Sequence, residues 1–331
     1  MSNLEVAVLG AGIVGLNTVL QIQEHFANAK ITLIDDKFNN ETLSYGPAGI
    51  FRPGTQFGGL PVDFVKQLVE YSYYYYKNLI PLSNSGISQI SGYLFSNTAE
   101  SIVKNRFLEN LLPVYRHANT EELHLFNNSW KFGSYFETLL TQCSLFLPWA
   151  LNRFEEYGGI KKKQRINNFR DLEGKFDVVF NCTGIGSKDL CNDRHVIPIR
   201  GQLLKVYAPW IKKFYYNDLD TFVIPLREGL VGLGTCKQYE SYNMKIDKHD
   251  TASIFERCVD LVPSIANSKI ISEWVGLRPY RHIFRLEMEN IAKIKIIHNY
   301  GHGGYGITTA PGTAHHAVKL FRKYHLNNSK L

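Results

Sequence analysis

The sequence predicts an α/β protein in which a parallel sheet and a mostly antiparallel sheet are interleaved along the chain. One observation is a strand–helix–strand unit at the start. It consists of an apolar, β-branched run at 6–9, apolar residues at helical spacing over 13–25, and a second strand at 30–34. Such a unit opens a doubly wound parallel sheet. The other observation is that 200–207 and 221–234 alternate between apolar and polar residues, as antiparallel strands do. Together they predict two domains made of discontinuous pieces.

The rest of the chain fits this division. A helix is expected from Pro61 or Asp63, and its tyrosines between 71 and 76 predict core and interface packing because they cover every face of the helix. The other expected elements are a helix at 148–157, strands at 164–169, 177–180 and 293–297, and a helix at 308–324. The predicted boundaries are 1–52, 145–190 and 293–331 for the first domain, and 53–144 and 191–292 for the second.

Composition and charge argue against several classes of protein. The 331 residues are 44% hydrophobic and carry a formal net charge of +7, which suits anionic small molecules. The one dense basic run, Lys161, Lys162, Lys163 and Arg165, has no interleaved aromatic residue, so a solvated strand end is favoured over a nucleic-acid patch. The five cysteines contain no CxxC pair, so no disulfide framework and no metal site are expected. Neither a membrane span nor a signal peptide is expected.

The end of the sequence carries a targeting signal. Ser329-Lys330-Leu331 matches the tripeptide that the peroxisomal import receptor reads at a free C terminus. A polar tail without meaning is the alternative. We therefore expect a location in the peroxisomal matrix, with the import receptor as a partner. The oligomeric state is not indicated.

The first functional motif is the glycine turn Gly10-Ala11-Gly12-Ile13-Val14-Gly15, between the first strand and the first helix. Gly10 permits the tight turn, Gly12 lets a pyrophosphate approach the backbone, and Gly15 lets the helix pack closely on the strand. The helix N terminus offers free N–H groups and a partial positive charge to phosphates. An acid about 20 residues further on, Asp35 or Asp36, is suited to bind ribose hydroxyls. The motif predicts a bound dinucleotide without distinguishing FAD from NAD.

Two further features point to chemistry. The loop from Gly301 to Gly306 lies between a strand and the last helix, so in a flavoprotein its N–H groups can stabilise negative charge on the reduced flavin; a tight turn without a ligand is the alternative. Arg278 precedes a proline, which favours an extended backbone, and is suited to bidentate capture of a carboxylate. The alternative, a structural salt bridge, fits Arg281 and Arg285 better.

In combination, these motifs resemble those of the D-amino-acid oxidase and D-aspartate oxidase family over nearly the whole chain. The stretches that carry the resemblance are the first glycine motif, Gly46-Pro47-Ala48-Gly49-Ile50, Asn181-Cys182-Thr183-Gly184, Gly276-Leu277-Arg278-Pro279 and His298-Asn299-Tyr300-Gly301-His302-Gly303-Gly304-Tyr305-Gly306. The resemblance implies a Rossmann-type FAD-binding domain and a substrate domain with a mostly antiparallel sheet, with non-covalently bound FAD between them.

The family's site residues are carried over by position. The implied FAD contacts are Gly10, Ala11, Gly12, Val14, Gly15, Asp36, Lys37, Thr42, Leu43, Gly49, Ile50, Ile166, Thr183, Gly303, Gly304, Tyr305, Gly306, Ile307 and Thr308. Arg278 is implied to bind the substrate α-carboxylate, and the Gly304 carbonyl to accept a hydrogen bond from the α-amino group. The implied reaction is hydride transfer from the α-carbon to flavin N5. Hydrolysis to an oxo acid and ammonia follows, and O2 reoxidises the flavin to give hydrogen peroxide.

The preferred substrate depends on the residues that meet its side chain. Arg52 stands where relatives that use neutral substrates tend to have an uncharged amide, and Lys237 aligns with a basic residue of the D-aspartate oxidases. These cations favour acidic D-amino acids such as D-aspartate, D-glutamate and N-methyl-D-aspartate. Against this, Asn217 and Phe222 replace an arginine and a carboxylate-binding tyrosine of the vertebrate aspartate-oxidase pattern. Any lid formed by 214–224 is expected to be small.

Other interpretations remain open from the sequence. Arg52 could pair with a protein acid and Lys237 could face solvent. An oxidase of neutral or basic D-amino acids is then the first alternative. A catalytically silent flavin-binding protein is the alternative from another class, although it would have no physical need for both Arg278 and the complete glycine loop.

Overall fold

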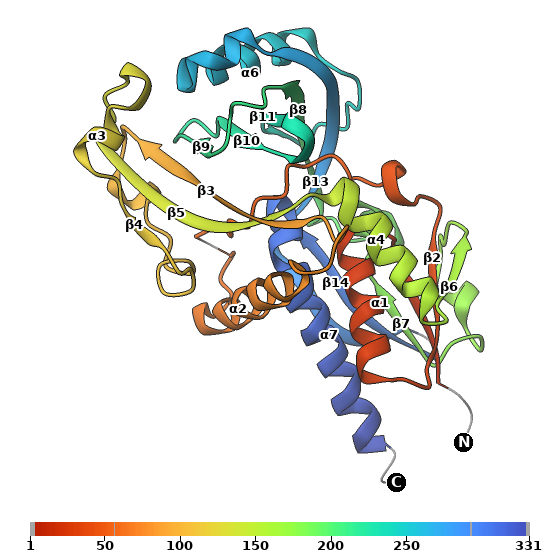
Figure 1. Cartoon of the computed structure of the whole chain (residues 1–331). Helices are drawn as coiled ribbons and strands as arrows, with labels where there is room; N and C mark the ends of the chain where they lie inside the picture. Colours follow the sequence, from red (N-terminus) through yellow and green to blue (C-terminus); the bar gives the residue numbers. More distant parts are fainter. Residues whose placement is uncertain (1–3, 56, 292, 329–331) are drawn as a thin grey trace.

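The computed structural model describes residues 4–55, 57–291 and 293–328. Its centre is a mixed sheet of 14 strands with helices packed against it (Figure 1). Along the sheet the strands follow the order β4-β5-β3-β9-β10-β11-β8-β13-β14-β7-β1-β2-β6, and β12 pairs with β8. The predicted α/β class, with parallel and antiparallel segments interleaved in the chain, is confirmed.

The parallel part of the sheet forms one end of this order. It contains β14 (Ile294–His302), β7 (Val178–Asn181), β1 (Glu5–Leu9), β2 (Lys30–Asp35) and β6 (Ile160–Lys163). The central strand β1 pairs with β7 on one side and β2 on the other, and Val6 and Val8 are fully buried, as expected for a strand covered on both faces. Helix α1 (Ile13–His25) packs between α4 (Cys143–Glu156) and α7 (Gly306–Asn328) against this part of the sheet (Figure 1).

The rest of the sheet is mostly antiparallel. Its strands are β3 (Ile87–Ser96), β4 (Tyr115–His117), β5 (Phe132–Thr141), β8 (Ile197–Tyr207), β9 (Phe214–Tyr216), β10 (Phe222–Pro225), β11 (Leu230–Gly234), β12 (Gln238–Tyr239) and β13 (Lys269–Ile291). Among these strands, only β3 and β9 pair in parallel within the described ranges. The remaining helices are α2 (Val62–Leu79), α3 (Thr120–Leu123), α5 (Ser187–Leu190) and α6 (Lys248–Leu261), of which α6 covers β8 and β11.

Strand β13 connects the two parts of the sheet. Its first half pairs with β8, and its second half pairs with β14, with an irregularity in the register between Tyr280 and Arg285. Tyr280 is paired with Ile197 on one side and with His302 on the other. The strands of the two predicted domains are thus hydrogen-bonded to each other, and the exact domain boundaries stay a prediction.

Several predicted elements begin or end elsewhere. The strand predicted at 164–169 is wrong, because the strand is β6, the exposed basic run at 160–163. Lysines on an edge strand discourage pairing with another chain, which explains a strand with so little apolar character. Helix α4 begins five residues before Pro148 and contains that proline in its second turn, although proline is more usual at a helix start.

The tyrosine cluster of α2 packs largely as predicted. Tyr73 and Tyr76 are buried in the main core, whereas Tyr74 is exposed. Tyr71 stacks on His315 of α7, with 4.1 Å between the ring centroids, and donates a hydrogen bond to Gln21 of α1. The cluster therefore joins three helices.

Candidate active site

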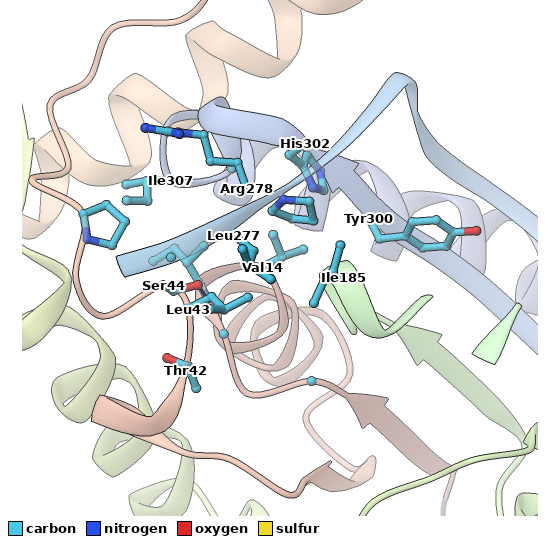
Figure 2. Close-up of a pocket in the computed structure, with 18 of the residues that line it drawn as sticks. Val14, Thr42, Leu43, Ser44, Ile185, Leu277, Arg278, Tyr300, His302 and Ile307 are labelled. Carbon is cyan, nitrogen blue, oxygen red and sulfur yellow. Dashed lines mark hydrogen bonds between the residues drawn. The ribbon is translucent and has the colours of Figure 1, made fainter. Parts of the chain in front are cut away.

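A cavity of about 610 Å³ lies where the carboxyl ends of β1, β2, β7 and β14 meet the antiparallel strands. The residues that directly follow these four strands, among them Gly10, Asp36, Cys182 and Gly303, all line it. Ligands of open α/β sheets bind outside the carboxyl ends of the strands. Figure 2 shows Thr42, Leu43 and Ser44 along one side of this space and Arg278 and His302 on the other.

The first glycine motif forms the tight turn between β1 and α1. Gly10 has a left-handed φ of 98°, and a side chain there would also collide with Cys182. A Cβ on Gly15 would overlap the carbonyl oxygen of Gly10, so this glycine brings helix and strand together. Gly12 caps α1 without a side-chain hydrogen bond, and Ile13 N–H donates to Ser44 Oγ at 3.0 Å. Gly10 and Gly12 line the cavity, whereas Gly15 supports the loop from behind.

The two acids after β2 have different surroundings. Asp35 accepts hydrogen bonds from Ala11 N–H at 2.6 Å and from Lys37 N–H at 3.3 Å. Burial raises the pKa of Asp35 to about 6. Asp36 lines the cavity, and its carboxylate lies 4.0 Å from the guanidinium of Arg165. Asp35 thus fixes the glycine loop, and Asp36 is the better placed of the two to reach a ribose.

Most predicted cofactor residues lie in the cavity wall. Those that line it are Gly10, Gly12, Val14, Asp36, Lys37, Thr42, Leu43, Gly49, Ile50, Ile166, Thr183, Gly303, Gly304, Tyr305, Gly306, Ile307 and Thr308. Ala11 and Gly15 are the two predicted contacts that do not line it, and both shape the loop instead. Their individual contacts with a cofactor stay a prediction.

Buried polar atoms in the wall favour a polar, planar ligand. The amide of Asn299 is fully buried, and neither its nitrogen nor its oxygen has a partner in the described part of the chain. Nε2 of His302 is likewise buried without a partner, and burial lowers the pKa of this histidine to about 4, so the ring is neutral. Buried polar atoms need hydrogen bonds. A flavin ring carries donors and acceptors of this kind, so the cavity fits FAD.

Arg278 is presented by β13 at the substrate end of the cavity. Its guanidinium donates to Thr235 Oγ1 at 3.0 Å and to the carbonyl oxygens of Cys236 and Arg200 at 3.3 and 3.4 Å. It packs on Gly201, where a Cβ would meet the guanidinium, and near Gly304. No carboxylate within the described ranges lies within 4.0 Å of it, and burial lowers its pKa.

The neighbouring arginines of β13, unlike Arg278, are paired with carboxylates. Arg281 is paired with Asp193 at 2.9 Å, and Arg285 with Glu287 at 2.6 Å. These two have the structural role that the sequence favoured for them. Arg278 is therefore the arginine of this strand that is available to an anionic ligand.

Arg52 also lines the cavity. Its guanidinium lies over the ring of Tyr216 at 4.6 Å from the centroid, and it makes no ion pair with an acid of the described chain. Tyr216 is buried against Phe222, with 5.2 Å between the ring centroids, and burial raises its pKa to about 12. Phe222 lines the cavity as predicted, so the wall here combines one cation with two aromatic rings.

Lys237 is not among the cavity residues. Its Nζ lies 2.6 Å from the carboxylate of Asp220, and both side chains are nearly half exposed. Asp220 belongs to the short turn between β9 and β10, in which Asn217 Oδ1 accepts from the N–H groups of Leu219 and Thr221. The proposed direct contact of Lys237 with a substrate is therefore not supported by its position. The turn between β9 and β10 is short, and a lid over the cavity stays a prediction.

Some wall residues were not foreseen from the sequence. Tyr216, Thr235 and Trp274 all line the cavity. The ring of Trp274 packs where Gly46 and Gly276 have no side chain. Gly276 lies two residues away on the same strand, whereas Gly46 is distant in sequence, so its contact with Trp274 could not be read from the sequence.

Other classes of site are not found. The described residues contain no cluster of His, Cys, Asp and Glu that could hold a metal ion. Over the same ranges, no helix is long and apolar enough to cross a membrane. All five cysteines are free thiols. Ser329, Lys330 and Leu331 lie outside the described residues, so the predicted import signal has no structural test.

Comparisons with known proteins point to the same cofactor as the cavity does. The family described as FAD dependent oxidoreductase matches residues 5–320. The chain is 34% identical to D-aspartate oxidase of Homo sapiens, over 97% of this chain and 95% of that protein. It is 32% identical to D-amino acid oxidase of Dugesia ryukyuensis, over 94% and 95% of the two chains. The structure of glycine oxidase from Bacillus cereus ATCC 14579 has the same fold, with a TM-score of 0.79 at 15% identity over 97% and 96% of the two chains.

Proposed function

The chain belongs to the FAD-dependent oxidoreductase family, and from this we propose that it is an oxidase of acidic D-amino acids. The reaction converts D-aspartate or a similar substrate to the 2-oxo acid and ammonia and reduces O2 to hydrogen peroxide. The names of the similar proteins, D-aspartate oxidase and D-amino acid oxidase, support this class of substrate. The observation that carries the proposal is the partly buried Arg278, which lines the cavity and has no carboxylate partner within the described residues.

The cofactor would lie along the carboxyl ends of the parallel strands. Gly10 and Gly12 would hold its pyrophosphate, Asp36 its adenosine ribose, and Gly303 to Thr308 its ring. When bound, FAD supplies the acceptor for two electrons and a hydrogen from the substrate α-carbon and passes the electrons to O2. The wall residues contribute binding, orientation and exclusion of water.

Arg278 would bind the α-carboxylate in the bidentate manner typical of arginine. Three protein oxygens already fix its guanidinium, so little side-chain entropy is lost when an anion binds. Gly304 lies beside Arg278 in the same wall, and its carbonyl oxygen would accept a hydrogen bond from the free α-amino group. Two anchors on adjacent substituents fix which face of the α-carbon is presented to the flavin.

A second cation in the cavity favours a second carboxylate on the substrate. Arg52 is held over Tyr216 and has no acid partner within the described ranges. Tyr216 interacts electrostatically with both Arg52 and Arg278, so the two guanidinium groups lie near one phenol. A neutral side chain would leave the charge of Arg52 uncompensated, whereas the side-chain carboxylate of D-aspartate would pair with it.

The first experiment is a substrate panel. Purified protein supplemented with FAD is mixed with D- and L-amino acids, and release of hydrogen peroxide is measured. Oxidation of D-aspartate and D-glutamate but not of D-alanine is the expected result. Oxidation of neutral D-amino acids alone would refute the acidic preference, and bound flavin without turnover of any amino acid would favour a silent binding protein.

The role of Arg52 has its own test. Arg52→Gln is expected to lower kcat/KM for D-aspartate about tenfold or more relative to D-alanine, because a charged hydrogen bond to the side-chain carboxylate is lost. Arg153→Gln is a matched control, since Arg153 also lies over an aromatic ring, Trp149 at 5.7 Å, but on the outer surface of α4. An equal loss for both substrates would exclude the proposed contact.

We also propose a peroxisomal location. It is supported by Ser329-Lys330-Leu331 and by the chemistry, because an enzyme that releases hydrogen peroxide is suited to a compartment that degrades it. The test is the location of the full chain with an N-terminal fluorescent tag, with and without residues 329–331. Punctate fluorescence that coincides with a peroxisomal marker only for the intact chain is expected, and diffuse fluorescence of both would contradict the proposal.

A further inference from the structure

We propose that Lys237 sets the affinity for acidic substrates indirectly, by neutralising Asp220 in the turn that precedes the wall residue Phe222. The inference rests on the proposed oxidation of acidic D-amino acids. It assigns Asp220 as a specificity-determining residue and gives Lys237 a role other than contact with the substrate. The ion pair between Lys237 Nζ and the Asp220 carboxylate, at 2.6 Å, is its starting point.

The turn that carries Asp220 is attached to the segment that carries Lys237. Arg257 of α6 donates to Thr221 Oγ1 at 2.7 Å and to the carbonyl oxygen of Leu219 at 3.4 Å. The same guanidinium donates to the carbonyl oxygen of Thr235 at 2.9 Å. Residues 219–221 and 235–237 are therefore held side by side by the partly exposed Arg257 guanidinium in addition to the ion pair.

The segment 235–237 also holds Arg278. Thr235 Oγ1 and the carbonyl oxygen of Cys236 accept hydrogen bonds from the Arg278 guanidinium at 3.0 and 3.3 Å. Lys237 is the next residue along the chain. The Asp220–Lys237 pair consequently lies on the outer side of the segment whose inner side fixes the arginine that would bind the substrate.

Asp220 lies two residues before the wall residue Phe222, and its turn is joined through Arg257 to Thr235, which binds Arg278. Burial is the largest influence on the pKa of Arg278 and lowers it, whereas Asp220 acts in the opposite direction. Asp220 also contributes to the raised pKa of Tyr216, in which burial is again the largest cause. A carboxylate in this position attracts Arg278 and repels an incoming dicarboxylate.

Lys237 cancels most of this effect while the ion pair is intact. Without the lysine, the carboxylate of Asp220 would oppose binding of every carboxylate at Arg278, and a dicarboxylate more than a monocarboxylate. Two charges at a partly exposed site interact enough to change an equilibrium constant roughly fivefold to tenfold. This is the size of effect expected when Lys237 alone is removed.

The proposal is tested with a double-mutant cycle on the FAD-loaded protein. The variants are Lys237→Met, Asp220→Asn and the double variant, and KM and kcat are measured for D-aspartate and D-alanine. We expect Lys237→Met to raise KM for D-aspartate roughly fivefold to tenfold, with less effect on D-alanine and little on kcat. The double variant is expected to return to within about twofold of the wild type. If Lys237 instead touches the substrate, the double variant stays as impaired as Lys237→Met, and the proposal is wrong.

A second measurement does not depend on turnover. Malonate and acetate are titrated into each variant, and binding is followed by the change in flavin absorbance. Malonate should bind more weakly to Lys237→Met and recover in the double variant, whereas unchanged malonate binding in all variants would overturn the proposal. Lys104→Met is the matched control, because Lys104 and Glu100 form a similarly exposed pair at 2.9 Å outside the cavity wall.

These experiments distinguish a failure of this inference from a failure of the proposed acidic preference. If the wild type oxidises only neutral D-amino acids, the proposed acidic preference fails. The influence of Asp220 is then read from KM for D-alanine and from acetate binding, since both ligands bring a carboxylate to Arg278. Recovery in the double variant would still support the inference, and a double variant as impaired as Lys237→Met would refute it.

Discussion

Replacement of Arg278 by methionine is the most direct perturbation of the proposed site. The side chain is partly buried, is held by Thr235 Oγ1 and two carbonyl oxygens, and faces no carboxylate of the described chain. Methionine keeps much of the length and apolar contact but removes the charge and the donors. The variant therefore isolates the interaction with an anionic substrate.

The expected loss follows from two charged hydrogen bonds. Each such bond contributes about 1.5–3 kcal/mol, so a bidentate contact contributes about 3–6 kcal/mol. A factor of ten corresponds to about 1.4 kcal/mol, which gives a loss of about 10²–10⁴ in kcat/KM. Arg278→Lys, which retains the charge without the planar fork, should fall between this variant and the wild type.

The assay is hydrogen peroxide release across a range of D-aspartate and D-alanine concentrations, together with flavin content from the absorbance spectrum. Both substrates should lose activity equally, because both have an α-carboxylate, and FAD should be retained. Arg285→Met is the control on the same strand, since Arg285 is already paired with Glu287 and Glu289. A loss of less than about tenfold for Arg278→Met would refute its assignment.

Three further predictions concern the cavity wall. Gly15→Ala should weaken FAD binding and lower the melting temperature, because a Cβ there overlaps the carbonyl oxygen of Gly10; calorimetry and flavin content measure both. Burial raises the pKa of Asp35 from 3.8 to about 6, so the native apoprotein loses stability as pH rises from about 4 to 6. Asp35→Asn can still accept a hydrogen bond from Ala11 N–H, and it should reduce this loss in the free energy of unfolding by roughly 3 kcal/mol, as measured by urea unfolding. Burial lowers the pKa of His302 from 6.5 to about 4, so this group contributes stability that disappears as pH falls through that window; His302→Leu should remove up to roughly 3 kcal/mol of the fall.

Each of these has an outcome that contradicts it. Unchanged flavin affinity in Gly15→Ala would show that the helix can shift without disturbing the loop. A pH dependence of unfolding that is parallel to the wild type in Asp35→Asn or in His302→Leu would show that the respective pKa is not shifted in the native state. The apoprotein is used for both titrations so that cofactor binding does not enter the free energy of unfolding.

The sequence was sufficient for the fold class and for the part of the site made of backbone. The glycine motif predicts its own backbone geometry. Gly10 is needed for a left-handed turn, and Gly15 is needed where the helix approaches the strand closely. Arg278 was also recognisable, since its neighbours in the sequence fix its strand. These features depend on local chain properties, which periodicity and motif spacing report.

The side-chain pocket could not be predicted in the same way. Arg52 and Tyr216 meet because β9 lies beside β10 and β3, a pairing between segments far apart in sequence. Lys237 was expected in the pocket and instead pairs with Asp220, because only the three-dimensional turn shows on which side of the segment it lies. The strand at 160–163 was missed because its lysines serve an exposed edge and give no apolar pattern.

The long strand β13 has a consequence for how this protein can change. Arg278 lies two residues before Tyr280 on this strand, and Tyr280 is paired with His302 at the start of the predicted cofactor loop. The spacing between Arg278 and the loop that would hold the flavin ring is thus fixed by strand pairing at Tyr280. Residues of β9, β10 and the turn between them could be exchanged, and new side-chain preferences acquired, without a change in this spacing.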